Sequence, residues 1–122
     1  MKRVFKTRNF SRWMRKTELS NAALCKAVEE MERGLVDADL GGNVLKKRVA
    51  LPRRGKSGSV RTLVATRRND VWFFVHGFEK KERANITAEE LEGLQELAQQ
   101  LLARTSVELD AAVRDGSLEE VP

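Results

Sequence analysis

Hydrophobic residues recur along this chain with two different periods, and the change of period separates helical from extended segments. Near the N-terminus Val4 and Phe5 predict a short strand, and helical spacing then continues over about residues 9–16. A second helix is expected to begin after Ser20, a residue type that commonly caps helices, and to end near Gly34. The positions that predict these helices are Phe10, Trp13 and Met14 in the first, and Leu24, Val28, Met31 and Leu35 in the second.

From residue 44 the period changes to two, which is typical of strands. Strands are predicted over 44–51, 60–66 and 71–78, and residues 52–59 and 67–70 have the composition of loops and turns. The 71–78 strand is the most apolar, so we expect it to be central and buried on both faces. Alternation in the first strand places Lys46, Arg48 and Ala50 on one face and Lys47, Val49 and Leu51 on the other.

Two capping boxes mark helix starts in the last third of the chain. The first, Thr87 to Glu90, opens a long amphipathic helix, and the second, Thr105 to Glu108, opens a short helix that ends before Gly116. With no internal repeat and no linker, residues 1–122 are expected to form one α+β domain. The apolar stripe of the long helix comprises Leu91, Leu94, Ala98 and Leu101.

Composition adds few constraints. The hydrophobic share of 41% is enough to form a core. The single cysteine, Cys25, lies on an apparent helix and is interpreted as a small packing residue, which fits a cytoplasmic protein. No stretch of about 18 apolar residues is present, so a membrane is not an expected partner.

The distribution of charge along the sequence is more informative than the overall composition. Residues 44–83 contain twelve Lys or Arg and three Asp or Glu, a net charge of +9 in a chain whose total is +5. Cations gathered on a small sheet repel one another unless a polyanion is near. The segment therefore predicts a nucleic-acid or phosphate site.

The sequence gives less support to a metal site, a phosphate-binding loop or a catalytic histidine. One histidine and one cysteine provide no metal-ligand spacing, and the chain is expected to use no metal and no cofactor. The 55–57 segment lacks the earlier glycine and the following helix of a phosphate-binding loop. His76 alternates with Trp72 and Phe74, so it is either a packing histidine or a proton-transfer group.

At this point three stretches, 40–50, 55–61 and 73–86, resemble the RelE/ParE superfamily of bacterial toxins, and more particularly its RelE/HigB-like branch. The likeness covers about residues 3–104. It implies a RelE-like fold: a small, twisted, mainly antiparallel sheet of about four strands, two N-terminal helices packed on it, and a C-terminal helix. Residues 105–122 would be a short helical extension, which could be a packed helix, a partner contact or a self-shielding tail.

The resemblance implies a ribosome-dependent mRNA endonuclease that promotes attack of a ribose 2′-OH on the adjacent phosphate without a metal. It implies catalytic roles for Lys46, Arg48 and Arg61, which match basic residues of the family's site, and for Lys81, which stands where RelE proper has an arginine. RelE proper also has a tyrosine where this chain has Thr87, so the general base is open, and the candidates are His76 or a lysine with a lowered pKa. RNA backbone contacts are expected from Arg53, Arg54, Lys56, Lys80 and Arg83.

Two other functions remain open at the level of sequence. A ParE-like member would inhibit DNA gyrase, and a non-catalytic RNA- or ribosome-binding protein would need only the cations. The resemblance implies a cognate antitoxin, which often carries a helix-turn-helix domain in this branch. Operator DNA would then be contacted only through the antitoxin.

Overall fold

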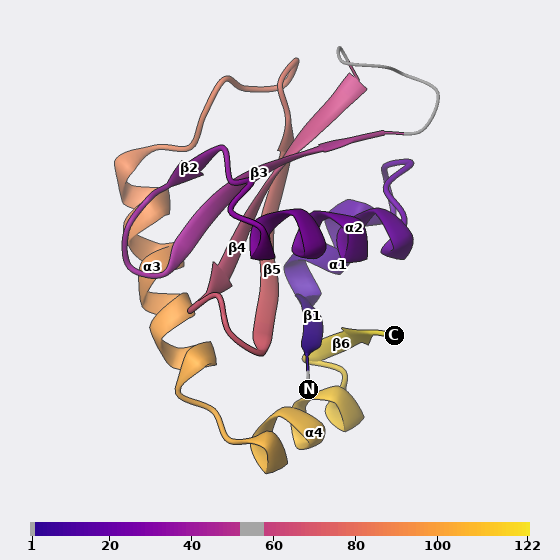
Figure 1. Ribbon diagram of the computed structural model, residues 1–122, viewed down its shortest axis with the longest axis vertical. Coiled ribbons are helices and arrows are strands. Elements are labelled where there is room, and N and C mark those ends of the chain that lie inside the picture. The colour runs from indigo at the N-terminus through magenta and orange to yellow at the C-terminus, as the bar shows by residue number, and fades with distance from the viewer. Residues whose placement is uncertain (1, 52–57) are drawn as a thin grey trace.

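The computed structural model describes residues 2–51 and 58–122, which form one mixed sheet with helices on both faces (Figure 1). The elements follow each other as β1 (Arg3–Thr7), α1 (Arg8–Met14), α2 (Asn21–Glu32), β2 (Ala38–Asp39), β3 (Val44–Ala50), β4 (Ser59–Thr66), β5 (Val71–Glu79), α3 (Ala88–Leu102), α4 (Ser106–Asp115) and β6 (Leu118–Val121).

The sheet has two more strands than expected. Within the described residues its order is β2-β3-β4-β5-β1-β6, and β1 pairs with β5 in parallel, while the other neighbours are antiparallel. The added strands are the two edges. β2 contains only two residues and β6 only four, so neither is long enough to show an alternating pattern in the sequence.

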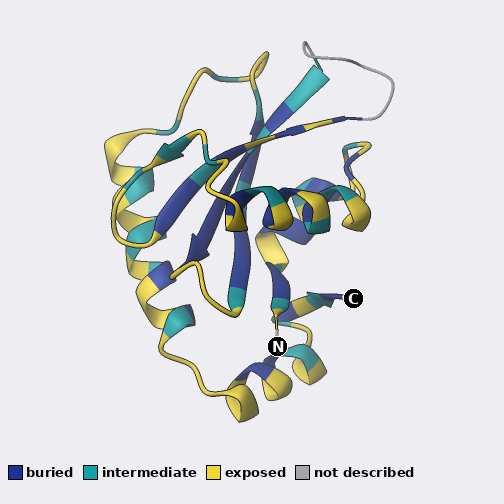
Figure 2. Ribbon diagram, in the orientation of Figure 1, coloured by how far each residue is buried: buried dark blue, intermediate teal, exposed yellow. Residues whose placement is uncertain are grey.

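Helices cover the two faces of the sheet in pairs. α1 and α2 bury Phe10, Leu24 and Val28 against one face, which includes Trp72 and Phe74 of β5. On the other face, α3 and α4 form a second cluster with strand residues. That cluster includes Phe5, Leu63, Phe73, Val75, Ala98, Leu101 and Leu109. Figure 2 shows the central strands buried and the outer sides of the helices exposed.

The position of β5 agrees with the prediction. Trp72, Phe73, Phe74 and Val75 are all at most 1% exposed, because β5 lies inside the sheet with helices on both sides. A register shift between Leu63 and Val64 of β4 gives β5 one extra residue at this point. The bulge keeps both Val75 and His76 on the α3 side, which strict alternation does not predict.

Helix ends agree with the capping signals, with one correction. Ser20, Thr87 and Thr105 cap α2, α3 and α4, and Gly116 ends α4 in the left-handed conformation with φ of 84°. The apolar stripe of α2, however, ends at Met31. Leu35 lies beyond the helix and is 54% exposed, since α2 ends before it and Gly34, with φ of 89°, turns the chain toward β2.

The C-terminal segment is integrated into the sheet. Leu118 and Val121 of β6 are buried, and Arg3 of β1 donates to Glu120 at 2.8 and 2.9 Å and to Asp110 at 2.8 Å. These ion pairs raise the pKa of Arg3 and hold the pKa of Glu120 below its usual range. Residues 105–122 therefore form a packed helix and an edge strand, not a separate tail.

Candidate nucleic-acid interface and active site

Cross-strand pairing brings the predicted cations into two adjacent rows. Arg48 lies opposite Arg61, which lies opposite Phe78, and in the next row Lys46, Leu63 and His76 are aligned in the same way. Side chains that are opposite each other in neighbouring strands lie on one face. We call Lys46, Arg48, Arg61, His76 and Phe78, together with Arg83, the cationic end of the sheet.

This end lies on the same face as α3 but beyond the apolar cluster that α3 covers. The cluster ends at Leu63 and Val75, and neither Arg61 nor Phe78 belongs to it. α3 begins only at Ala88, and its first turn meets this end through Glu90, which pairs with Arg83. Figure 1 shows the ends of β3 and β4 and the β5–α3 connection together at one end of the molecule.

Arg48 and Arg61, two of the predicted catalytic cations, are held by different contacts. The Arg48 side chain is 58% exposed, with its Nε 3.4 Å from Asp37 Oδ1, and the Arg48 amide donates to Asp37 Oδ2 at 2.6 Å. Arg61 donates to the Ser59 hydroxyl and carbonyl oxygens at 3.2 and 3.3 Å. Both arginines keep donors available for a further acceptor.

Lys46 is the least constrained member. It is half-buried, and within residues 2–51 and 58–122 its ammonium makes no ion pair or hydrogen bond. The neighbouring Lys47 points to the other face, where Glu30 and the Leu35 carbonyl both lie 3.0 Å from its Nζ. One residue of register thus separates a structural lysine from one that is open to a ligand.

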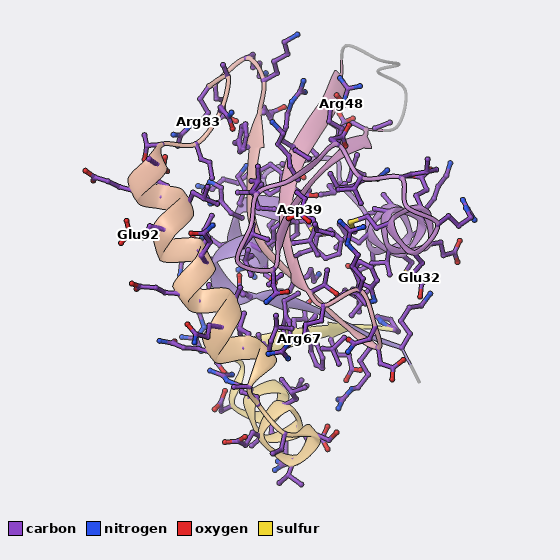
Figure 3. All side chains as sticks on the ribbon, turned by 60° about the vertical axis from the view of Figure 1, so that its left-hand side comes forward. Glu32, Asp39, Arg48, Arg67, Arg83 and Glu92 are labelled. Atoms are coloured by element: carbon purple, nitrogen blue, oxygen red, sulfur yellow. The ribbon has the colours of Figure 1, made fainter. Side chains whose placement is uncertain are left out.

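Arg83 belongs to this site more closely than the sequence indicates. Its guanidinium lies 5.9 Å from the Phe78 ring centroid and forms a two-point ion pair with Glu90, at 2.9 and 2.5 Å. That ion pair raises the pKa of Arg83 and lowers the pKa of Glu90 to about 2. Figure 3 shows Arg83 on the connection to α3 and Arg48 on β3, both toward the same end of the molecule.

Glu90 has two functions at once. Its carboxylate also accepts from the Thr87 amide at 2.9 Å, which completes the capping box of α3. The start of α3 therefore fixes the Arg83 side chain over Phe78. The sequence signal was present in the capping box, but nothing in the spacing of residues 83 and 90 indicates that their side chains meet.

His76 lies close enough to this ion pair for both of its charges to affect the pKa of the imidazole. Burial lowers the pKa of His76, Arg83 lowers it further, and Glu90 raises it in part. Its Nε2 is buried and has no hydrogen-bond partner among the described residues. The ring lies 6.1 Å from that of Phe78, so a neutral imidazole borders the row that contains Arg48 and Arg61.

The other predicted residues are not joined to the two rows. Lys80 and Lys81 are exposed in the turn after β5, and no described contact connects either with the cationic end. Arg53, Arg54 and Lys56 lie outside the described residues. In the described part of the chain, no cluster of three His, Cys, Asp or Glu could hold a metal, and no helix there is both long and apolar enough to cross a membrane.

Comparison with known proteins agrees with the family resemblance of the sequence. No curated protein sequence matches the chain. A family model described as the RelE toxin of the RelE/RelB toxin–antitoxin system matches residues 2–121, and thus includes the C-terminal helix and β6. Since this match covers nearly the whole chain, the protein belongs to the RelE toxin family.

Proposed function

We propose that this toxin is a ribosome-dependent mRNA endonuclease, in which the cationic end of the sheet binds and cleaves the message. Membership in the RelE family supports a toxin that generally inhibits translation, with a cognate antitoxin as partner. The observation that carries the proposal is the alignment of Lys46, Arg48 and Arg61 beside His76 at the edge of the apolar cluster that α3 covers.

The arrangement suits a phosphodiester. Arg48 and Arg61 lie opposite each other, and their guanidinium groups can each present two donors to phosphate oxygens. Lys46 adds a positive charge that no carboxylate in the described residues neutralises. Charge on the phosphate oxygens increases in the transition state, so donors fixed in advance around it lower the barrier.

A proton must also leave the ribose 2′-OH. Among the described members of the cationic end, His76 is the group whose lowered pKa leaves it neutral, and therefore basic, at neutral pH. Its buried Nε2 requires the ring to turn toward the RNA when the message binds. Glu90 is a weaker candidate, since its pKa near 2 leaves it a poor proton acceptor.

Arg83 adds a group that holds RNA in place. It lies over Phe78, at the edge of the row formed with Arg61, and Glu90 restrains it. With Lys80 and Lys81 on the adjoining turn, and with Arg53, Arg54 and Lys56, it would contact RNA backbone around the scissile phosphate. The antitoxin would mask these cations, and a helix-turn-helix domain on it would connect the pair to operator DNA.

Primer extension on a defined mRNA in a purified bacterial translation system tests the proposal. Cuts that require ribosomes and leave 2′,3′-cyclic phosphate ends, with metal chelation of the isolated toxin having no effect, are expected. Cuts on naked RNA would indicate a free ribonuclease. Growth arrest without cuts would move the function to gyrase inhibition, tested by DNA supercoiling, or to RNA binding alone.

A further inference from the structure

A pocket of about 370 Å³ lies on the α1–α2 side of the sheet, on the face opposite to the cationic end. Lys6 of β1 and Ser11 of α1 line it, and the start of α2 contributes Asn21. Glu119 of the edge strand β6 forms another wall. The pocket shares no lining residue with the proposed nuclease site.

Lys6 places a buried positive charge in this pocket. The residue is only 5% exposed, although it lies in a basic N-terminal segment whose charges would ordinarily be solvated. Its Nζ donates to Asn21 Oδ1 at 2.9 Å and lies 2.7 Å from Glu119 Oε2. Because an ammonium loses its hydration on burial, an anionic oxygen at this point offsets a substantial cost.

Ser11 is a donor without an acceptor. It is 8% exposed, and its hydroxyl has no hydrogen-bond partner among the described residues. Buried hydroxyls are rarely left unpaired in folded proteins. The first turn of α2, a twelve-residue helix beginning at Asn21, adds backbone amides that no intrahelical carbonyl can bond. Arg15, exposed at the rim, supplies a second positive charge.

The shape of the pocket favours a carboxylate on a flexible arm. Met14 and Leu19, both nearly buried, provide apolar walls that fit the methylene groups of an acidic side chain. A phosphate inside an RNA backbone has no such arm with which to reach a lysine that is 5% exposed. Glu119, whose side chain is 56% exposed, already places a carboxylate on Lys6.

We propose that this pocket binds the carboxylate of an acidic side chain from a protein partner, in the place that Glu119 fills in the free chain. Residues 1–16 contain seven Lys or Arg and no Asp or Glu, so the surroundings favour an acidic segment. The antitoxin that family membership implies could supply it. The assignment does not rest on the nuclease proposal, since the two sites lie on different faces of the sheet.

Amide NMR of the full chain, titrated with N-acetylglutamate amide, tests the assignment. Shifts are expected at Asn21 and its neighbours in the first turn of α2, and none with the glutamine analogue. Glu119→Gln, which removes the competing carboxylate, is expected to tighten binding about threefold to fivefold, the factor that an ion pair with one exposed partner contributes. The matched variant Glu96→Gln, at an exposed position of α3, is expected to bind as the wild type does.

A second variant tests the unpaired hydroxyl. Ser11→Ala removes the donor at little structural cost and is expected to weaken binding about threefold. Three results would overturn the assignment: no shift in the wild type or in Glu119→Gln, equal affinity of the wild type and Glu119→Gln, or stronger binding of inorganic phosphate or a short RNA than of the glutamate probe.

Discussion

Two halves of one sheet face carry opposite chemistry on the same strands. Under α3 and α4, Phe5, Leu63 and Phe73 form a closed apolar cluster, whereas one row further along β4 Arg61 lies between Arg48 and Phe78. The register shift between Leu63 and Val64 lies at the boundary between the halves and keeps His76 on the α3 side. The difference lies in the apolar cluster under α3 and α4, which covers one half and reaches Leu63 but includes neither Arg61 nor Phe78.

The covered half supports stability, and the proposed function assigns RNA binding to the other half. Apolar side chains gain free energy when a helix removes them from water. Three neighbouring cations gain nothing from being together unless an anion arrives. Substitutions in the two halves should therefore separate loss of stability from loss of activity.

The largest effect is expected from Phe73→Ala in the covered half. The ring is fully buried and stacks on Phe5 with centroids 5.3 Å apart, so its loss should lower the free energy of unfolding by about 3–5 kcal/mol. Urea denaturation measures this. The control Leu35→Ala, at a 54% exposed position, should change it by no more than about 0.5 kcal/mol.

Lys46 and Lys47 provide a matched pair across the two faces. Lys46→Ala should reduce cleavage about a hundredfold with stability unchanged, because it removes a charge next to the developing phosphate charge. Lys47→Ala should leave the cleavage rate of the folded protein unchanged and cost about 1–3 kcal/mol of stability, since Glu30 and the Leu35 carbonyl lose their partner. Equal effects on cleavage would refute the assignment of faces.

Most of this face assignment could be predicted from the sequence, and its boundaries could not. Alternation alone separated Lys46 and Arg48 from Lys47, and the capping boxes placed the starts of α3 and α4. The bulge opposite Leu63 and the ion pair between residues 83 and 90 depend on tertiary packing that no local period records. The catalytic role expected of Lys81 and the RNA contact expected of Arg83 stay predictions.

A smaller effect is expected from Glu90→Gln. Glutamine can keep the capping box but not the charge that holds Arg83 over Phe78, so cleavage should fall about twofold to fivefold. Glu108→Gln makes the same change in the capping box of α4, far from Arg83 in the sequence, and should not alter cleavage. Single-turnover cleavage on programmed ribosomes compares the two variants.

The smallest effect is a pH dependence of stability that arises from His76. The folded protein holds its pKa below the ordinary value of 6.5, so the unfolded chain binds the proton first as pH falls. The stabilisation that neutral His76 contributes is complete above pH 6.5 and is lost as pH falls below that value. The slope of the unfolding free energy against pH then corresponds to at most one proton.

Denaturation between pH 7.5 and about 5.5 measures this slope, and the window lies above the ordinary pKa of 4.5 at which Glu90 titrates in the unfolded chain. His76→Gln should remove the slope in that window. An unchanged slope in the variant would show that His76 is not held neutral by the fold.

The most direct test of the account compares Arg61→Ala with Arg33→Ala by primer extension on ribosomes programmed with one mRNA. Arg61 lies in the middle of the cationic row, while Arg33 is an exposed arginine at the end of α2, so the loss of charge is the same. If the cationic end is the nuclease site, ribosome-dependent cuts fall about a hundredfold or more in Arg61→Ala and persist in Arg33→Ala. Wild-type cutting by folded Arg61→Ala would contradict it.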